Sequence, residues 1–288
     1  MPNILVTGMP RSGTTLIVSL LNRQPNLIAL AEPFIIDTDL GREGAVDQIE
    51  TLLNEVRIAA LAGAPITTKH VGGHVPDNWV EPPKAGGGLR RVLEERSGLH
   101  FDKPLTADFT LVVKHPAEFT ALSDLLVHRY PLYAVVRDPV AVLAAWQTVD
   151  MPVRHGRMPM LERLAPEYLR AHLNAFESPL PRQVALIEFQ LETYAALPRE
   201  RVLRYEDVVA NPGAALGSLC QGATDFPELA PYDPAKRYEG VDIDALADAV
   251  RPIMPLIKQF YPDIEDRWHG YLGTSCRSQP QEAPLSAR

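Results

Sequence analysis

The sequence contains few cysteines and no long apolar segment. Only Cys220 and Cys276 occur in 288 residues, which excludes a disulfide framework and favours a reducing compartment. No stretch approaches the roughly 20 apolar residues that a membrane helix needs. The first residues, MPNILVTG, lead directly into a short apolar run without a basic leader region. We therefore expect a cytoplasmic protein that does not enter a membrane.

Positive charge is also scarce. The chain has 36 acidic and 28 basic residues, and its formal net charge is −8. A nucleic-acid surface needs a basic face, so we do not expect nucleic acid as a partner. Any anion-binding site must instead be assembled locally, from a few cations and from helix N-termini.

The segment GMPRSGTT, residues 8–15, has the outline of a phosphate-binding loop that lacks one residue. Thr14 stands where a nucleoside-triphosphate loop carries lysine, although the glycine spacing is right. An apolar run precedes the segment and an apolar stripe at helical spacing follows it, so backbone N–H groups should converge on an anion. Arg11 adds a planar cation suited to phosphate or sulfate oxygens. Because the missing lysine would contact β- and γ-phosphates, its absence argues against a triphosphate ligand.

Short apolar runs alternate with helical patterns along most of the chain. Strands are predicted at 4–7, 27–30, 110–113, 132–136 and 202–203, and helices at 13–23, 45–62, 117–129, 139–147, 161–175, 182–197, 212–221 and 242–260. This alternation predicts an α/β fold with a central parallel sheet between two helical layers. Residues 63–108 are rich in glycine and proline and predict a loop insertion. We expect one domain over 1–272 and a disordered tail over 273–288.

Three motifs together resemble the sulfotransferases that use 3′-phosphoadenosine 5′-phosphosulfate. PRSGTTL (10–16) is similar to their 5′-phosphosulfate loop, YPLYAVVRDPVAVLAAW (130–146) to their 3′-phosphate segment, and VLRYEDVVANPGAAL (202–216) to their strand, Tyr-Glu-Asp and helix segment. The motifs occur in the order of that family. The resemblance implies a P-loop-type three-layer fold and metal-independent transfer of a sulfonate group from this donor to a small-molecule acceptor. The acceptor group would be a hydroxyl or, less readily, an amine.

The resemblance also implies which residues bind the donor. Arg137 would hold the 3′-phosphate, and Tyr205 would lie near the adenine or the 3′-phosphate. The loop would contribute Pro10, Arg11, Ser12, Gly13, Thr14 and Thr15.

The chain departs from the family pattern at two places. The family has a helix serine eight residues after the 3′-phosphate arginine, and Ala145 stands there, with Trp146 and Gln147 as the neighbouring candidates to replace it. The C-terminal glycine-rich basic segment of the cytosolic members has no clear counterpart, and Lys236-Arg237 is the nearest substitute.

Lys114 ends the apolar run TLVVK and should reach the carboxyl edge of the sheet, where α/β proteins bind ligands. In the family, a lysine in a similar Lys-x-Pro context contacts the oxygen that bridges phosphate and sulfur. We expect Lys114 to take that role. Residues 63–108 and 161–197 are expected to shape the acceptor pocket.

Two residues compete as the general base. Glu32 lies 21 residues after Arg11, and tyrosylprotein-type and related sulfotransferases have a glutamate base at a similar distance from that arginine. As a base near neutral pH, Glu32 would need burial to raise its pKa. His115 corresponds to the histidine base of the cytosolic enzymes that act on phenols and steroids. Glu32 is favoured, because the adjacent Lys114 can then keep the charge-stabilising role.

Two other functions remain open. A kinase-like phosphotransferase would need Mg²⁺ and a loop lysine, which is missing. A non-catalytic phosphoadenosine-binding module fits the absent hydroxyl at Ala145, but Lys114 beside a base argues against it. His70 and His74 have a helical metal-ligand spacing, but the glycines between them disfavour a helix, so no metal is expected. The segment KAGGGLRR (84–91) is interpreted as a flexible turn. The sequence predicts neither the identity of the acceptor nor the oligomeric state.

Overall fold

The central feature of the fold is one parallel sheet. The computed structural model describes residues 3–83, 88–220, 225–230, 238 and 240–268. Within these residues, five strands lie in the order β2-β5-β1-β6-β7, and every neighbouring pair is parallel. They are β1 (Asn3–Gly8), β2 (Leu27–Ala31), β5 (Thr110–Lys114), β6 (Leu132–Val136) and β7 (Val202–Arg204). The five predicted strands are confirmed, and the phosphate loop leaves the central one.

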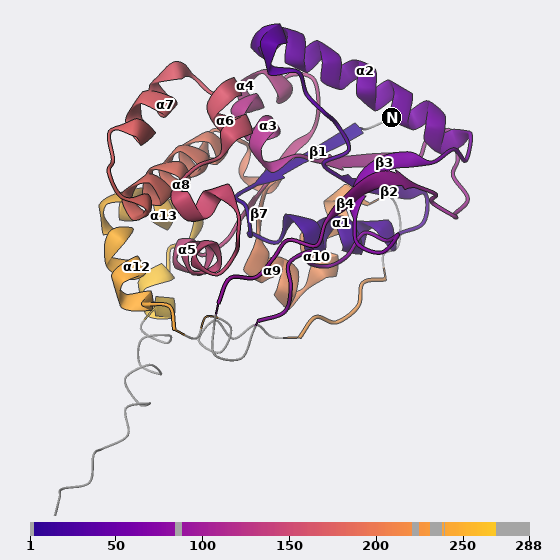
Figure 1. Cartoon of the computed structure of the whole chain (residues 1–288). Helices are drawn as coiled ribbons and strands as arrows, with labels where there is room; N and C mark the ends of the chain where they lie inside the picture. The colour runs from indigo at the N-terminus through magenta and orange to yellow at the C-terminus, as the bar shows by residue number, and fades with distance from the viewer. Residues whose placement is uncertain (1–2, 84–87, 221–224, 231–237, 239, 269–288) are drawn as a thin grey trace, which may run out of the picture.

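Helices cover both faces of this sheet (Figure 1). One face carries α1 (Thr14–Asn22), α9 (Tyr205–Ala210) and α10 (Pro212–Leu216). The other face carries α2 (Gly41–Leu61), α3 (Pro116–Ala121), α4 (Ser123–Leu126), α5 (Pro139–Gln147) and α8 (Pro179–Ala195). This second layer is extended by α6 (Pro159–Leu164), α7 (Glu167–Asn174), α12 (Ile243–Ala249) and α13 (Met254–Phe260). The three-layer α/β/α class is confirmed, although the helices predicted over 117–129, 161–175 and 242–260 are each divided into shorter ones.

Two apolar cores hold the layers together. Along β1, Leu5 packs into the larger core, whereas Ile4 and Val6 pack into the smaller one on the opposite face. This alternation follows from the strand, because successive side chains point to opposite faces. Each fully buried side chain of this kind contributes about 1.5–3 kcal/mol. The carboxyl ends of the strands are therefore fixed from both sides.

The region predicted as a loop insertion, residues 63–108, contains a small sheet of its own. β3 (Ile66–His70) and β4 (Glu95–Leu99) pair antiparallel. Thr68 fastens this pair to the end of β2, because its Oγ accepts from the Ala31 N–H at 2.9 Å and donates to the Ala31 carbonyl at 3.2 Å. As a result, β3 and β4 bring polar side chains to the carboxyl edge of the main sheet.

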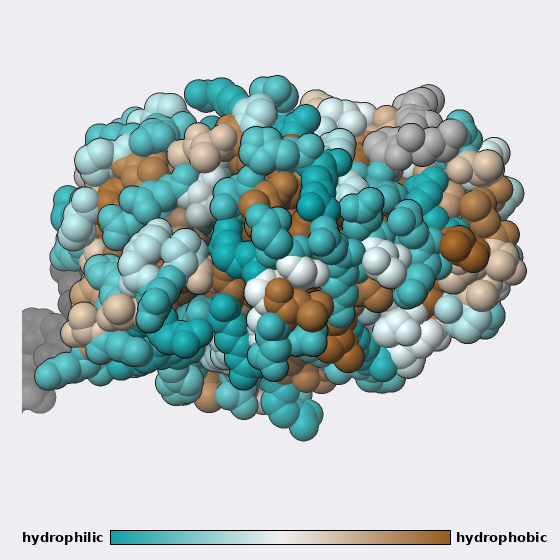
Figure 2. Space-filling view, turned by 90° about the horizontal axis from the view of Figure 1, so that it is seen from above, coloured by the Kyte–Doolittle hydropathy of each residue, from teal (hydrophilic) through white to brown (hydrophobic). Residues whose placement is uncertain are grey.

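The surface is mostly polar, and Figure 2 shows small groups of hydrophobic residues scattered among polar ones on the face seen from above. In the described part of the chain, no helix is both long and apolar enough to cross a membrane. Some residues named in the sequence analysis lie outside the described residues. They are the predicted tail at 273–288 with Cys276, the pair Lys236-Arg237, and residues 84–87 of the predicted turn.

Candidate active site

The phosphate loop forms a tight turn between β1 and α1. The Ser12 N–H donates to the Met9 carbonyl at 3.0 Å, and Arg11 adopts a left-handed φ of 70°, which is uncommon outside glycine. Gly13 has a φ of 95°, and a Cβ built there would lie 2.3 Å from the Tyr205 ring, so only glycine fits. The loop and the first turn of α1 line one cavity, where N–H groups and the helix dipole favour an anion.

Arg137, at the end of β6, lines the same cavity as Arg11. Its Nη1 donates to the Arg11 carbonyl at 3.0 Å, and its guanidinium lies 4.5 Å from the centroid of the Tyr205 ring. The Tyr205 ring thus packs against both Gly13 and Arg137. The cavity measures about 380 Å³. The two arginines that the sequence assigns to separate phosphates therefore face one space.

Most of the residues predicted to bind the donor line this cavity. They are Pro10, Arg11, Gly13, Thr14, Thr15, Arg137 and Tyr205. Ser12 does not appear among the described lining residues, but its Oγ is buried and has no hydrogen-bond partner in the described part of the chain. A hydroxyl left without a partner beside a glycine cradle fits a loop that binds phosphate or sulfate oxygens.

At the wall of the cavity, the buried Lys114 forms an ion pair with the partly exposed Glu32. The Lys114 Nζ lies 2.7 Å from the Glu32 Oε1 and 4.1 Å from the centroid of the Trp79 ring. Glu32 has a left-handed φ of 50°, and its N–H donates to the Lys114 carbonyl at 2.8 Å. The backbone hydrogen bond and the side-chain ion pair together hold the Glu32 carboxylate against the Lys114 ammonium. Strain of this kind persists where the surrounding structure fixes it, and it gathers at functional sites.

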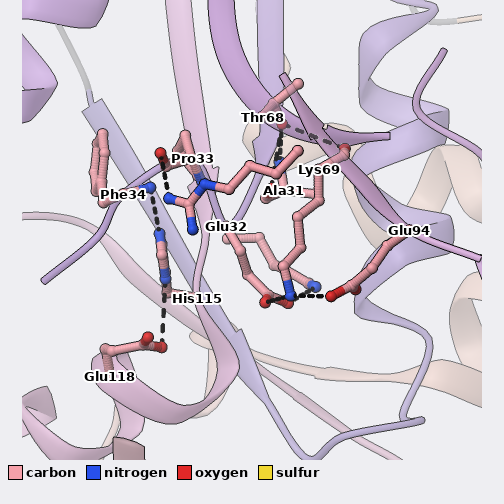
Figure 3. A network of polar contacts seen from close by, with 11 residues as sticks. Ala31, Glu32, Pro33, Phe34, Thr68, Lys69, Glu94, His115 and Glu118 are labelled. Carbon is pink, nitrogen blue, oxygen red and sulfur yellow. Dashed lines mark hydrogen bonds and ion pairs between the residues drawn. The ribbon is translucent and has the colours of Figure 1, made fainter. Parts of the chain in front are cut away.

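A second lysine, which the sequence analysis missed, binds the other oxygen of Glu32. The Lys69 Nζ lies 2.6 Å from the Glu32 Oε2 and 2.7 Å from the Glu94 Oε1 (Figure 3). Lys114, Glu32, Lys69 and Glu94 therefore form one chain of alternating charge. The β-branched residues Ile66, Thr67 and Thr68 were the local signal for a strand there, whereas the alternation of burial along β3 is visible only in the structure.

The electrostatics of Glu32 differ from the sequence-based expectation. Burial raises the pKa of this carboxyl, but the positive charges of Lys114 and Lys69 outweigh it and lower the pKa to about 2. Burial also lowers the pKa of the Lys114 ammonium, and Glu32 opposes that shift. The raised pKa that we expected for a glutamate base is therefore absent. Glu32 is an ionised hydrogen-bond acceptor at neutral pH.

His115 lies behind the cavity wall. The residue is only 1% exposed, and its ring packs between Phe34 and Phe119. The centroid of the His115 ring lies 5.5 Å from that of Phe34 and 5.0 Å from that of Phe119. Its Nε2 accepts from the Phe34 N–H at 3.2 Å, and its Nδ1 lies 3.3 Å from the Glu118 Oε2 (Figure 3). Among the described residues that line the cavity, Glu118 and Glu32 are present and His115 is not. Of the two rival bases, the geometry favours Glu32.

The helix that follows Arg137 shows what stands in place of the family's serine. Ala145 is buried, and Gln147 donates to the Gln183 Oε1 at 2.8 Å. The Trp146 Nε1 donates to the Pro10 carbonyl at 2.8 Å. None of the three helix residues is among the described lining of the cavity. Trp146 therefore holds the phosphate loop through the Pro10 carbonyl and does not replace the serine hydroxyl that is missing at position 145.

The part of the cavity wall formed by residues 116–118 and 151–160 has a different character. It is largely apolar and comprises Pro116, Ala117, Met151, Pro152, Val153, Met158, Pro159 and Met160, together with the charged residues Glu118 and Arg157. Arg157 pairs with Glu162 at 3.0 Å. Residues 77–79 also line the cavity, as expected for 63–108, but no described residue of 161–197 does, because residues 158–160 at the start of α6 take that place.

The two histidines with a metal-ligand spacing do not lie on a helix. His70 is in β3, and its Nε2 lies 2.6 Å from the Ser97 Oγ. In the part of the chain that the structure describes, no group of three or more side chains could hold a metal ion.

Comparisons with known proteins find distant likenesses only. No protein-family profile and no curated protein matches the chain. A sulfotransferase from Alicyclobacillus acidocaldarius is 14% identical, with 88% of this chain and 95% of that chain covered and a TM-score of 0.35. The sulfotransferase domain from the curacin biosynthetic pathway is 18% identical, with 84% and 79% covered and a TM-score of 0.34. A sulfotransferase from Mycobacterium tuberculosis H37Rv is 15% identical, with 87% and 76% covered and a TM-score of 0.37. Likenesses this distant do not place the chain in a family, so its function must be argued from the site.

Proposed function

We propose that the protein transfers a sulfonate group from 3′-phosphoadenosine 5′-phosphosulfate to a hydroxyl, or less readily an amine, of a small molecule. The observation that carries the proposal is that Arg11 and Arg137 line one cavity together with the lysine-free loop and the Lys114–Glu32 pair. A donor with one phosphate on the 3′ oxygen and another on the 5′ oxygen of its ribose needs two cationic sites that face one space. A nucleoside triphosphate would need the loop lysine instead.

The donor substrate fits the residues present. The N–H groups of Gly13, Thr14 and Thr15 at the start of α1 would hold the 5′-phosphosulfate, with Arg11 supplying charge. Arg137 would hold the 3′-phosphate. When bound, the donor supplies a sulfonate group joined to a good leaving group, so the protein needs no metal to activate it.

Transfer requires one proton to move and one charge to be stabilised. The acceptor oxygen forms a bond to sulfur while the bond from sulfur to the bridging oxygen breaks, and that oxygen departs with the electron pair. Lys114 donates a hydrogen bond to the departing oxygen, and Glu32 accepts the hydroxyl proton. A weakly basic carboxylate suffices, because the proton becomes strongly acidic as the new bond forms. Lys69 keeps Glu32 in place when Lys114 turns toward the donor.

Ligand-induced thermal stabilisation tests the donor. Adenosine 3′,5′-bisphosphate, ATP with Mg²⁺, and AMP are compared at equal concentration, the first and last in EDTA. A ligand that binds only the folded protein raises the melting temperature, and at equal concentration the tighter ligand raises it more. We expect the bisphosphate to stabilise most. Greater stabilisation by ATP with Mg²⁺ would reject the proposal in favour of a phosphotransferase.

A transfer assay separates an enzyme from a sensor. Radiolabelled donor is incubated in EDTA with a panel of hydroxylated small molecules, and labelled products are counted. We expect transfer to at least one acceptor, and we expect Glu32→Gln to abolish it while bisphosphate binding remains. Tight bisphosphate binding without transfer to any acceptor would indicate a non-catalytic binding module.

A further inference from the structure

Glu118 places a carboxylate in the apolar half of the cavity. It lies on α3, which packs against α6, and these two helices carry much of the proline and methionine wall. Its side chain is 13% exposed and lines the cavity. A charged group in such surroundings requires a partner, because removing it from water costs several kcal/mol.

His115 supplies only part of that partnership. The Phe34 N–H donates to the His115 Nε2, so this nitrogen carries no proton and the ring is neutral, with its proton on Nδ1. The Nδ1 lies 3.3 Å from the Glu118 Oε2. Within the described residues, no side chain donates a hydrogen bond to the Glu118 Oε1. The pair therefore presents one net negative charge to the cavity.

Burial raises the pKa of Glu118, whereas hydrogen bonds from the His115 ring and from the local backbone lower it. Glu32, a second ionised carboxylate that lines the cavity, also raises the pKa of Glu118. Its charge is matched by Lys114 and Lys69, whereas that of Glu118 is not matched by any cation among its described contacts.

We propose that the acceptor is an amino alcohol with an apolar skeleton, whose ammonium group pairs with Glu118 and whose hydroxyl reaches Glu32. This inference rests on the proposed sulfonate transfer. The apolar wall suits a hydrocarbon body and offers little hydrogen bonding to a sugar. An acid would be repelled by Glu118. Because an ammonium group held at a carboxylate has no lone pair, sulfonation occurs on oxygen and not on nitrogen.

Matched acceptors test the charge preference in the unmodified protein. Aliphatic alcohols of one skeleton carry at the far end an ammonium, a methyl or a carboxylate group, and each is prepared in several chain lengths. With donor in excess and EDTA present, kcat/KM is measured for each. We expect the amino alcohol of the best length to exceed the neutral alcohol by at least about tenfold, and the acid to react least. A neutral alcohol that reacts as well as every amino alcohol would overturn the inference.

Glu118→Gln tests the residue. We expect the ratio of kcat/KM for the amino alcohol to that for the neutral alcohol to fall at least about tenfold, through KM. Glu192→Gln on the exposed face of α8 is the matched control and should leave the ratio unchanged. A loss that is equal for both acceptors would overturn the inference, because it would indicate a base or a purely structural role.

Two further measurements keep the outcomes distinct. Mass spectrometry of the product, before and after mild acid treatment, should find the acid-resistant O-sulfonate; an N-sulfonate would count against the inference. If the bisphosphate stabilises the protein and the neutral alcohol is preferred, only this inference fails. If the bisphosphate does not bind and no acceptor reacts, the sulfonate-transfer proposal fails and takes this inference with it.

Discussion

Arg137 donates a hydrogen bond to the backbone carbonyl of Arg11 at 3.0 Å, across 126 residues of sequence. The bond ties the end of β6 to the turn that follows β1. An acidic protein thereby fixes two cations on one cavity. A chain with a net charge of −8 can bind an anion only where cations are gathered locally, and the paired arginines provide such a place.

Removal of the Arg137 guanidinium should weaken donor binding. Arg137→Met loses charge-assisted hydrogen bonds worth about 1.5–3 kcal/mol, so we expect the Kd for adenosine 3′,5′-bisphosphate to rise about 10- to 100-fold in isothermal titration. Arg91→Met is the control, since Arg91 is 76% exposed and pairs with Glu81 on the surface. An unchanged Kd for Arg137→Met would show that the second phosphate binds elsewhere.

Gly13→Ala should damage the loop in two ways. Its methyl group would overlap the Tyr205 ring, and its φ of 95° is strained for alanine. We expect a loss of stability of at least about 1 kcal/mol and little remaining bisphosphate binding. The double variant Gly13→Ala/Tyr205→Ala relieves the overlap alone and should recover only part of the stability, as measured by chemical denaturation. Wild-type stability and binding in Gly13→Ala would contradict the geometry of the loop.

Breaking the Lys114–Glu32 pair from one side should cost more than removing both partners. Glu32→Gln leaves the buried Lys114 ammonium without its carboxylate, and we expect a loss of about 3 kcal/mol in the free energy of unfolding. Lys114→Met added to Glu32→Gln removes the stranded charge and should restore part of that loss. A double-mutant cycle in urea measures the coupling, and strict additivity of the two changes would argue against the ion pair.

Stability should fall in acid through Glu32. Folding lowers the pKa of this carboxyl from 4.5 to about 2, so its contribution is complete above pH 4.5 and is lost as the pH falls from 4.5 to 2. The difference in unfolding free energy between wild type and Glu32→Gln should shrink across that window. A difference that stays constant from pH 5 to pH 2 would indicate that Glu32 is not ion-paired.

Lys69→Met should shift that window. With one of two ammonium groups removed, the pKa of Glu32 should rise by about 1 unit, because an opposite charge in contact lowers a carboxyl pKa by 1–3 units. A carboxyl titration by NMR measures the change. Lys69→Arg keeps the positive charge and is the control. An unchanged Glu32 pKa in Lys69→Met would show that Lys114 alone lowers the pKa of Glu32.

Local signals in the sequence predicted the framework of the site. The apolar runs that end at Gly8, Lys114 and Val136 are buried parallel strands, and parallel strands deliver the residues that follow them to one edge. For this reason the sequence alone predicted that Arg11, Lys114 and Arg137 lie at the same edge of the sheet.

The rest depended on contacts between distant segments. β3 and β4 are joined by 24 residues, so no tight-turn signature marks the pair, and β4 is almost wholly exposed. Nothing local reveals that Lys69 pairs with Glu32 or that Glu118 lines the cavity, so both residues were missed. The pKa of Glu32 was expected to rise from its burial alone, and the two lysines that reverse it come from strands 37 and 82 residues further along.

The Trp146 Nε1 donates a hydrogen bond to the Pro10 carbonyl, and this bond affects how the loop would bind the proposed donor. This bond fastens the turn after β1 to α5, and the Arg137–Arg11 bond fastens the same turn to the end of β6. A site preorganised in this way loses little backbone entropy on binding. The Ser12 amide donates to the Met9 carbonyl within this turn, so its deuterium uptake should be slow in the free protein, and Trp146→Phe should speed it without changing any group that lines the cavity.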